Sequence, residues 1–303
     1  MSFSEQIYER AVLDVIQELG YTYISAEDID RDTYKNPLYM RDLYDSLSRI
    51  NTNLPLDVID SAIFNLQHVD AGGLVQKNRR FMDWLQNGME VTYMHRGKER
   101  TSIVYLIDYE NIENNSFVVV NQWTVAGAER TKRPDIVIFV NGLPLVVMEL
   151  KSGSSENVDI SSAYRQIRNY QKDIPELFIY NAFNVISDHT YSKAGTITAS
   201  EEWYKEWKTV DGSYEDTRLA AYDVLFGGML EKSRFLEIIK NFILFEDSTP
   251  EDIKILAQYH QFYAVKKAVV STLKAVESDG RAGVFWHTQG SGKSLSMVFY
   301  TKL

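Results

Sequence analysis

The first twenty residues place apolar and polar positions with the spacing of a helix. Apolar residues recur every three or four positions, and Gly20 stands where a helix is expected to end. We predict an amphipathic helix from about Ser2 to Gly20, with Glu5 and Glu9 near the edge of its buried face. Residues 27–90 contain further helical segments, LYMRDLYDSLSRI and LDVIDSAIFNLQHV, joined by TNLP and AGG, which predict a helical layer.

From about Glu90 the apolar pattern changes to that of strands. The segments VTYMH, TSIVYLIDY and NSFVVVNQWTV are rich in β-branched and aromatic residues and are separated by turn-forming residues. Two more apolar runs, IVIFV and LPLVVMEL, follow Pro134. The change of period predicts an α/β protein built on a mixed sheet.

The turn between these last two runs decides where their end residues point. Asn141 and Gly142 give a strong hairpin signal. A two-residue loop would leave Asp135 and Glu149 on opposite faces, because each step along a strand reverses the side chain. A three-residue loop of Val140, Asn141 and Gly142, with Gly142 at positive φ, would put both carboxylates on one face as diagonal neighbours. We predict the three-residue loop.

The end of the LPLVVMEL run carries the candidate chemistry. Glu149 and Lys151 project to the same side of the strand. With Asp135 beside them, the two carboxylates can hold Mg²⁺, next to an ammonium group. The metal would polarise a scissile phosphate and lower the pKa of a bound water, while Lys151 orients that water or offsets phosphoryl charge. Phosphodiester hydrolysis fits this chemistry; the alternative is a structural ion pair of Glu149 and Lys151 at a strand end.

Composition bounds the class of protein and the choice of metal. With 303 residues, 45% hydrophobic and 24% charged, the chain is long enough for about two domains. No run approaches the roughly 18 apolar residues of a membrane-spanning helix, and MSFSEQIYER lacks the pattern of a secretory signal, so we expect a cytoplasmic protein. The sequence has 0 cysteines, which excludes thiolate metal sites and favours Mg²⁺ or a similar hard cation.

The overall charge argues against a free-standing DNA binder. The formal net charge is −10 and the sequence pI is about 5.1, so a nucleic-acid substrate would need help from other groups to be held. A basic cluster of Arg130, Lys132 and Arg133 precedes Asp135. On charge alone, this cluster is typical of a solvated loop.

Two later segments carry further signals. SSAYRQIRNYQKDIPELF places Gln166 and Tyr170 four residues apart on one face of a helix, which in isolation is an ordinary surface pair. The polar segment DSTPED is the best candidate for a domain boundary, at about residues 246–252. It divides the chain into a first domain, 1–247, and a second, 248–303.

The second domain contains a phosphate-binding pattern. RAGVFWHTQGSGKSLSMVFYTKL predicts a short strand, a glycine-containing loop and a helix. Backbone N–H groups of this loop would cradle phosphates, with Lys293 reaching the terminal ones and the Ser294 hydroxyl ligating Mg²⁺. The loop residues are Gly290, Ser291, Gly292, Lys293 and Ser294. His287 occupies the position of the first glycine of the strict G-x-x-x-x-G-K-[ST] pattern.

These motifs resemble known families. PD, thirteen residues and then ELK resemble the core of PD-(D/E)xK nucleases, which implies a mixed sheet between helices. Gln166 and Tyr170 resemble the Q-x-x-x-Y element of the RecB-like branch, which supports DNA handling or catalytic geometry. The resemblance also implies an acidic residue on the first helix beside the metal: Glu9, with Glu5 an almost equally good candidate. HTQGSGKS resembles helicase motif I, and AQYHQFYAVKKAVV the adenine-reading element, with Gln261 as reader.

In this order, the motifs resemble the N-terminal part of the R subunits of type I restriction enzymes, over almost the whole chain. The resemblance implies an ATP-driven translocase that pulls double-stranded DNA towards modification (methyltransferase) and specificity subunits and then cuts it. Because the chain ends just after motif I, we expect a fragment of a longer subunit, without productive ATP hydrolysis. The start of a RecA-like domain would then follow the nuclease.

Three alternatives stay open on the sequence. One is a P-loop ATPase with a non-catalytic adaptor domain. A second is a nuclease fold that has lost cleavage and docks partner subunits. The third is a repair or defence helicase-nuclease that is not linked to a modification methyltransferase.

Overall fold

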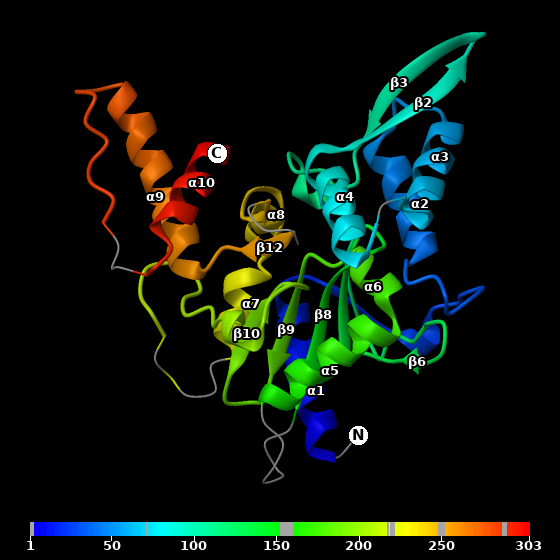
Figure 1. Cartoon of the computed structure of the whole chain (residues 1–303), viewed down its shortest axis with the longest axis horizontal. Helices are drawn as coiled ribbons and strands as arrows, with labels where there is room; N and C mark the ends of the chain where they lie inside the picture. Colours follow the sequence, from blue (N-terminus) through cyan, green and yellow to red (C-terminus); the bar gives the residue numbers. More distant parts are fainter. Residues whose placement is uncertain are drawn as a thin grey trace.

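Six strands form one sheet at the centre of the computed structural model, which describes residues 3–70, 72–151, 160–216, 218, 222–247, 252–286 and 290–303 (Figure 1). In spatial order they are β1 (Thr22–Ser25), β4 (Phe117–Asn121), β7 (Ile136–Val140), β8 (Leu143–Leu150), β9 (Phe183–Ser187) and β10 (Ser192–Gly195). The pairs β1–β4 and β8–β9 are parallel and the other three are antiparallel. The predicted mixed sheet is therefore confirmed.

Helices cover both faces of this sheet. Along β7, Ile136 and Ile138 join the core on the side of α1 (Phe3–Glu18), whereas Val137 and Phe139 join the core on the side of α5 (Ile160–Asp173). All eight residues of β8 are buried, as expected of a strand covered on both faces.

The remaining helices follow the same two sides. The core on the side of α1 includes residues of α2 (Met40–Ile50), α3 (Leu56–Gln67), α4 (Leu74–Asn87), α7 (Tyr222–Met229) and α8 (Lys232–Asn241). The core on the side of α5 includes residues of α6 (Pro175–Ile179). Short 3-10 turns occur at Ala26–Asp28, Ile112–Asn114 and Glu201–Trp203. No helix in the described ranges is long and apolar enough to cross a bilayer.

Two of the predicted strands do not join the central sheet. β2 (Met89–His95) and β3 (Lys98–Val104) pair only with each other and project from the body as a two-stranded arm (Figure 1). Most of their side chains are exposed to solvent, so burial of apolar side chains does little to hold these two strands against the core. Another small pair, β5 (Val125–Ala126) and β6 (Thr131–Lys132), leads into β7.

The predicted three-residue loop of the β7–β8 hairpin is wrong. The loop has two residues, Asn141 and Gly142, both at positive φ (51° and 76°), and Val140 pairs with Leu143. Farther along, Ile138 pairs with Val146 because Leu145 is an extra residue in a β-bulge. The bulge shifts the register by one residue, and its continuation sets Asp135 opposite Glu149. The two carboxylates thus leave the hairpin on the same side, as predicted, but through a bulge rather than a longer loop.

The C-terminal region begins with a hairpin that contacts α4 and the residues before β9. β11 (Ile243–Glu246) pairs with β12 (Ile253–Leu256) across the predicted boundary, of which residues 248–251 lie outside the described part. Lys254 of β12 is 2% exposed, and its ammonium group donates to Asn78 Oδ1 (2.9 Å) and the Asn181 carbonyl (2.6 Å). Burial lowers the Lys254 pKa well below its usual value.

Two helices follow, α9 (Tyr259–Val276) and α10 (Lys293–Lys302), which pack on each other. The short strand predicted before the phosphate-binding loop is not formed: residues 281–286 have no regular structure, and Val284 is 94% exposed. In the described part of the chain, no strand lies beside this segment to supply backbone hydrogen-bond partners. Without such partners the segment does not form a strand.

Candidate active site

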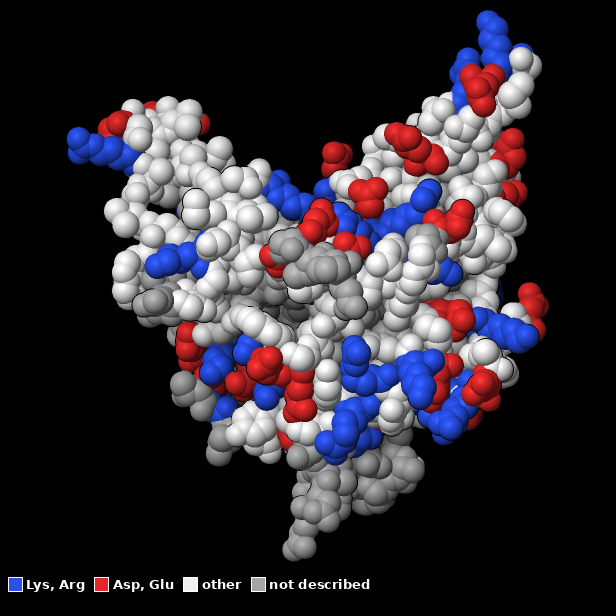
Figure 2. Space-filling model, in the orientation of Figure 1, with Lys and Arg blue, Asp and Glu red and all other residues white. Residues whose placement is uncertain are grey.

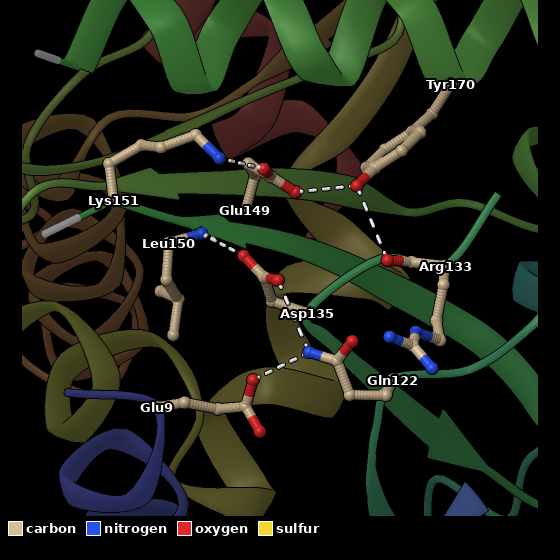
Figure 3. Close-up of polar contacts among 8 residues, drawn as sticks. All are labelled: Glu9, Gln122, Arg133, Asp135, Glu149, Leu150, Lys151 and Tyr170. Carbon is tan, nitrogen blue, oxygen red and sulfur yellow. Dashed lines mark hydrogen bonds and ion pairs between the residues drawn. The ribbon is translucent and has the colours of Figure 1, made fainter. Parts of the chain in front are cut away.

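A hollow of about 330 Å³ lies beside α5, where β7 begins and β8 ends. Five of the predicted site residues line it: Glu9, Asp135, Lys151, Gln166 and Tyr170. The sixth, Glu149, is buried behind the hollow and bonds to two of them. Residues 140 positions apart in sequence therefore gather at one end of the sheet (Figure 3).

Glu149 is held by two side chains, one on each carboxylate oxygen. The Lys151 ammonium group pairs with Oε1, and the Tyr170 hydroxyl donates to Oε2 at 2.9 Å. Glu149 and Lys151 lie on one side of the strand end, as the alternation of side chains requires. Gln166, one helical turn before Tyr170, hydrogen-bonds to the Tyr170 hydroxyl. The Q-x-x-x-Y pair thus faces Glu149 and is not an ordinary surface pair.

Asp135 lies directly before β7 and faces the end of β8. Its Oδ2 accepts a hydrogen bond from the Leu150 backbone N–H at 2.8 Å. Its Oδ1 lies 3.4 Å from Gln122 Nε2, and its backbone oxygen accepts from the Gln122 N–H at 2.8 Å. The carboxylate is therefore fixed from both neighbouring strands.

Glu9 reaches the same end of the sheet from α1. Its two oxygens accept hydrogen bonds from Asn121 Nδ2 (2.8 Å) and Gln122 Nε2 (2.7 Å). The Gln122 amide therefore bridges Glu9 and Asp135 (Figure 3). The Glu5 side chain lies outside the described residues. The sequence interpretation missed Asn121 and Gln122; their polar side chains at the end of the apolar FVVV run were the available signal.

Burial changes the acidity of both central carboxyls. Loss of solvent raises the pKa of Asp135 to about 6, against the opposing effects of the Leu150 N–H and the Lys151 charge. The pKa of Glu149 is raised to about 7, first by burial and then by the charge of Asp135. When both carboxyl groups are ionised, the positive charge near them therefore does not fully compensate their negative charge.

This donor set fits a hard divalent cation. Asp135 lines the hollow and Glu149 lies directly behind it, so both supply carboxylate oxygens at this point, and their raised pKa values indicate that Lys151 alone does not balance their charges. Mg²⁺ takes one or two protein carboxylates and leaves its other positions to water and phosphate. Among the described residues, no group of three His, Asp or Glu side chains could hold a metal ion together. The Glu9 oxygens instead accept hydrogen bonds from Asn121 and Gln122.

The raised pKa values predict how stability changes with pH. A carboxyl whose pKa is higher in the folded state stabilises the fold most below its unfolded pKa and loses this contribution as pH rises through the folded pKa. Between pH 4 and pH 7.5, the metal-free protein should lose on the order of 1–3 kcal/mol relative to the Asp135→Asn/Glu149→Gln variant. Thermal melting of both proteins across this range measures the difference. A difference that stays constant with pH would contradict the assignment.

The candidate phosphate-binding loop and Gln261 lie together at the start of α10. Gln261 is 2% exposed, and its Nε2 donates to the Gly292 carbonyl at 3.3 Å. Gly290 and Gly292 have φ of 83° and 75°, which favours glycine at both positions. Lys293 and Ser294 form the first turn of α10, so their N–H groups are at a helix N-terminus. Residues 287–289, including His287, lie outside the described part.

A mixed sheet with helices on both faces, carrying two carboxylates and a lysine where neighbouring strands end, fits an α/β nuclease. A family model described as "Type I restriction enzyme R protein N terminus" matches residues 2–203. The chain belongs to this family. A second model, described as "SWI2/SNF2 ATPase", matches residues 260–303.

Curated relatives agree with the family. The chain is 38% identical over 311 residues to the type I restriction enzyme HindI endonuclease subunit of Haemophilus influenzae, a match that covers 98% of this chain and 30% of the relative. It is 23% identical over 296 residues to the type I restriction enzyme SauCOLORF180P endonuclease subunit of Staphylococcus aureus, covering 97% of this chain and 29% of the relative. The chain thus spans about 30% of the length of the relatives it matches.

Proposed function

We propose that this chain carries the endonuclease of a type I restriction-modification enzyme, a PD-(D/E)xK nuclease domain over residues 1–247 that hydrolyses phosphodiester bonds of duplex DNA with Mg²⁺. The observation that carries the proposal is the joint placement of Asp135, Glu149 and Lys151 at one end of the sheet, tied to Tyr170 of the helix that follows. Asp135, Lys151 and Tyr170 line one hollow, and Glu149 lies buried behind it in contact with two of them, which a structural ion pair alone does not require.

Each residue has a physical task in this site. Asp135 and Glu149 would hold the metal, which would supply Lewis-acid polarisation of the scissile phosphate and a water of lowered pKa. The Lys151 ammonium group offsets charge that develops on the phosphoryl oxygens. Tyr170 and Gln166 fix the orientation of Glu149. Glu9 acts through the Gln122 amide, which fixes the other side of Asp135.

We further propose that residues 248–303 begin a RecA-like motor that binds ATP. Gly290, Ser291 and Gly292, with the N–H groups of Lys293 and Ser294, would surround phosphates at the start of α10, where the helix dipole favours negative charge. Gln261 would read the adenine. Its packing on Gly292 and the match of residues 260–303 to an ATPase family support this assignment.

The partners follow from the same proposal. The HindI and SauCOLORF180P relatives are named endonuclease subunits, so we infer that the protein works in a cytoplasmic complex with modification (methyltransferase) and specificity subunits. Delegating target recognition to those subunits agrees with the acidic charge of −10. No membrane partner is involved in this proposal.

Plasmid cutting by the reconstituted complex tests the function. We expect an unmodified plasmid with the recognition site to be linearised only when both Mg²⁺ and ATP are present, and the same plasmid after methylation to stay intact. Cutting that ignores methylation would favour a repair or defence helicase-nuclease. Binding of the partner subunits without any cutting would favour a docking module.

A further inference from the structure

Three cations precede Asp135, and they differ in their surroundings. The Asp173 carboxylate at the end of α5 lies 3.1 Å from the Lys132 ammonium group and 3.7 Å from the Arg130 guanidinium group. Asp173 thus shares its single negative charge between the two, and Arg133 receives none of it. Arg133 is exposed and has no salt bridge within the described ranges of the chain. Of the three, Arg133 therefore has a charge that no described carboxylate offsets.

The backbone of Arg133 is fixed relative to the candidate catalytic residues. Its carbonyl oxygen lies 3.5 Å from the Tyr170 hydroxyl, which donates to Glu149. Two residues later the chain places Asp135, so both central carboxylates are tied to this segment. Arg133 lines the hollow itself, and its guanidinium group points to the side of Gln122, with no hydrogen bond or ion pair to any residue drawn (Figure 3).

More cations lie on the outer face of α5, opposite its buried residues. Arg165, Arg168 and Lys172 are exposed and lie three and four residues apart, on one stripe of the helix. Figure 2 shows Lys and Arg side chains gathered over α5 and towards β6. In a chain of net charge −10, these cations give α5 a local positive surface that can attract an anionic polymer.

From this placement we propose that Arg133 binds a backbone phosphate of duplex DNA next to the scissile one and so positions the substrate. The inference rests on the proposed nuclease function and adds a residue to it. A guanidinium group suits this task because its planar fork can donate two hydrogen bonds to one phosphate. Arg133 does not touch the reacting atoms; it is a positioning residue. The basic segment is therefore more than a solvated loop.

DNA binding with a matched control tests the proposal. The chain carrying Glu149→Gln, in Ca²⁺, is titrated against a fluorescent duplex of about 24 base pairs at several salt concentrations, alone and with Arg133→Ala, Arg133→Lys or Arg130→Ala. Arg133→Ala should raise Kd about 5- to 20-fold and reduce the salt slope by about 0.9, the value for one phosphate contact. Arg130→Ala removes an equal charge that Asp173 already offsets and should change Kd less than about 2-fold.

The remaining readouts separate positioning from folding and from catalysis. Arg133→Lys should restore part of the affinity, and all variants should keep the melting temperature of the parent. In the cutting enzyme, Arg133→Ala should raise KM more than it lowers kcat. Equal effects of Arg130→Ala and Arg133→Ala, an unchanged Kd for Arg133→Ala, or no binding by the parent at about 100 µM would each overturn the proposal. Continued cutting by Glu149→Gln would instead refute the nuclease assignment and leave the Arg133 result standing.

Discussion

Replacing Lys151 by methionine should lower the rate of DNA cutting by about 10³-fold while ATP turnover by the complete enzyme is unchanged. Methionine keeps the length of the side chain and removes the charge, so Glu149 loses its ion pair and the phosphoryl oxygens lose their nearest cation. Asp135→Asn and Glu149→Gln should have effects of similar size, because each removes a negative charge from the metal site but keeps the shape of the side chain.

Plasmid linearisation and ATP hydrolysis, measured on the same preparations of the reconstituted complex, check this expectation. The ATPase rate serves as the control for folding and assembly. Loss of both activities in all three variants would indicate a structural role for the cluster. Cutting at the wild-type rate by any of the three would remove that residue from the catalytic site.

Gly142→Ala should destabilise the fold by about 2–5 kcal/mol. Part of this cost comes from the φ of 76°, which an alanine adopts with strain of roughly 1–2 kcal/mol. The rest comes from packing: a Cβ here would lie 2.5 Å from both the Leu43 nitrogen and the Tyr39 oxygen, which are backbone atoms at the start of α2 and cannot move independently. The hairpin turn would have to separate from that helix.

Gly97→Ala is the matched control. Gly97 has a similar φ of 73° in the exposed β2–β3 turn, and a Cβ there would meet no atom within 4 Å. This variant should lose only about 1–2 kcal/mol. Urea unfolding of both variants separates the two contributions. Equal losses would mean that close packing on α2 contributes nothing at Gly142.

Local patterns determine much of this fold. The apolar residues of IVIFV and LPLVVMEL predicted two neighbouring strands, and β7 and β8 form there because both faces of the sheet are covered. The helical spacing of the first twenty residues predicted α1, which brings Glu9 to the site. Strand alternation predicted that Glu149 and Lys151 lie on one side of the strand end. Tyr170 was expected beside them only through the resemblance of its segment to the Q-x-x-x-Y element.

Other features depend on contacts between distant parts of the chain. The bulge at Leu145 cannot be predicted from the turn residues Asn141 and Gly142, and it is seen only in the pairing of β8 with β7. β2 and β3 pair with each other and not with the central sheet. The apolar pattern of a strand does not show which other strand it will pair with. Likewise, Asp173 forms ion pairs with Arg130 and Lys132 but not with Arg133. These pairs join residues about forty positions apart, so the sequence alone does not show them.

Calorimetric titration of the chain with Mn²⁺, which prefers the same oxygen ligands as Mg²⁺, tests the central claim most directly. The claim is that Asp135 and Glu149 together form a divalent-metal site. It predicts a binding event at pH 7.5 that is abolished in the Asp135→Asn/Glu149→Gln variant and weakened at pH 5.5, where protons compete for carboxyls with pKa of about 6 and about 7. Binding of equal strength in the wild type and the double variant would contradict it.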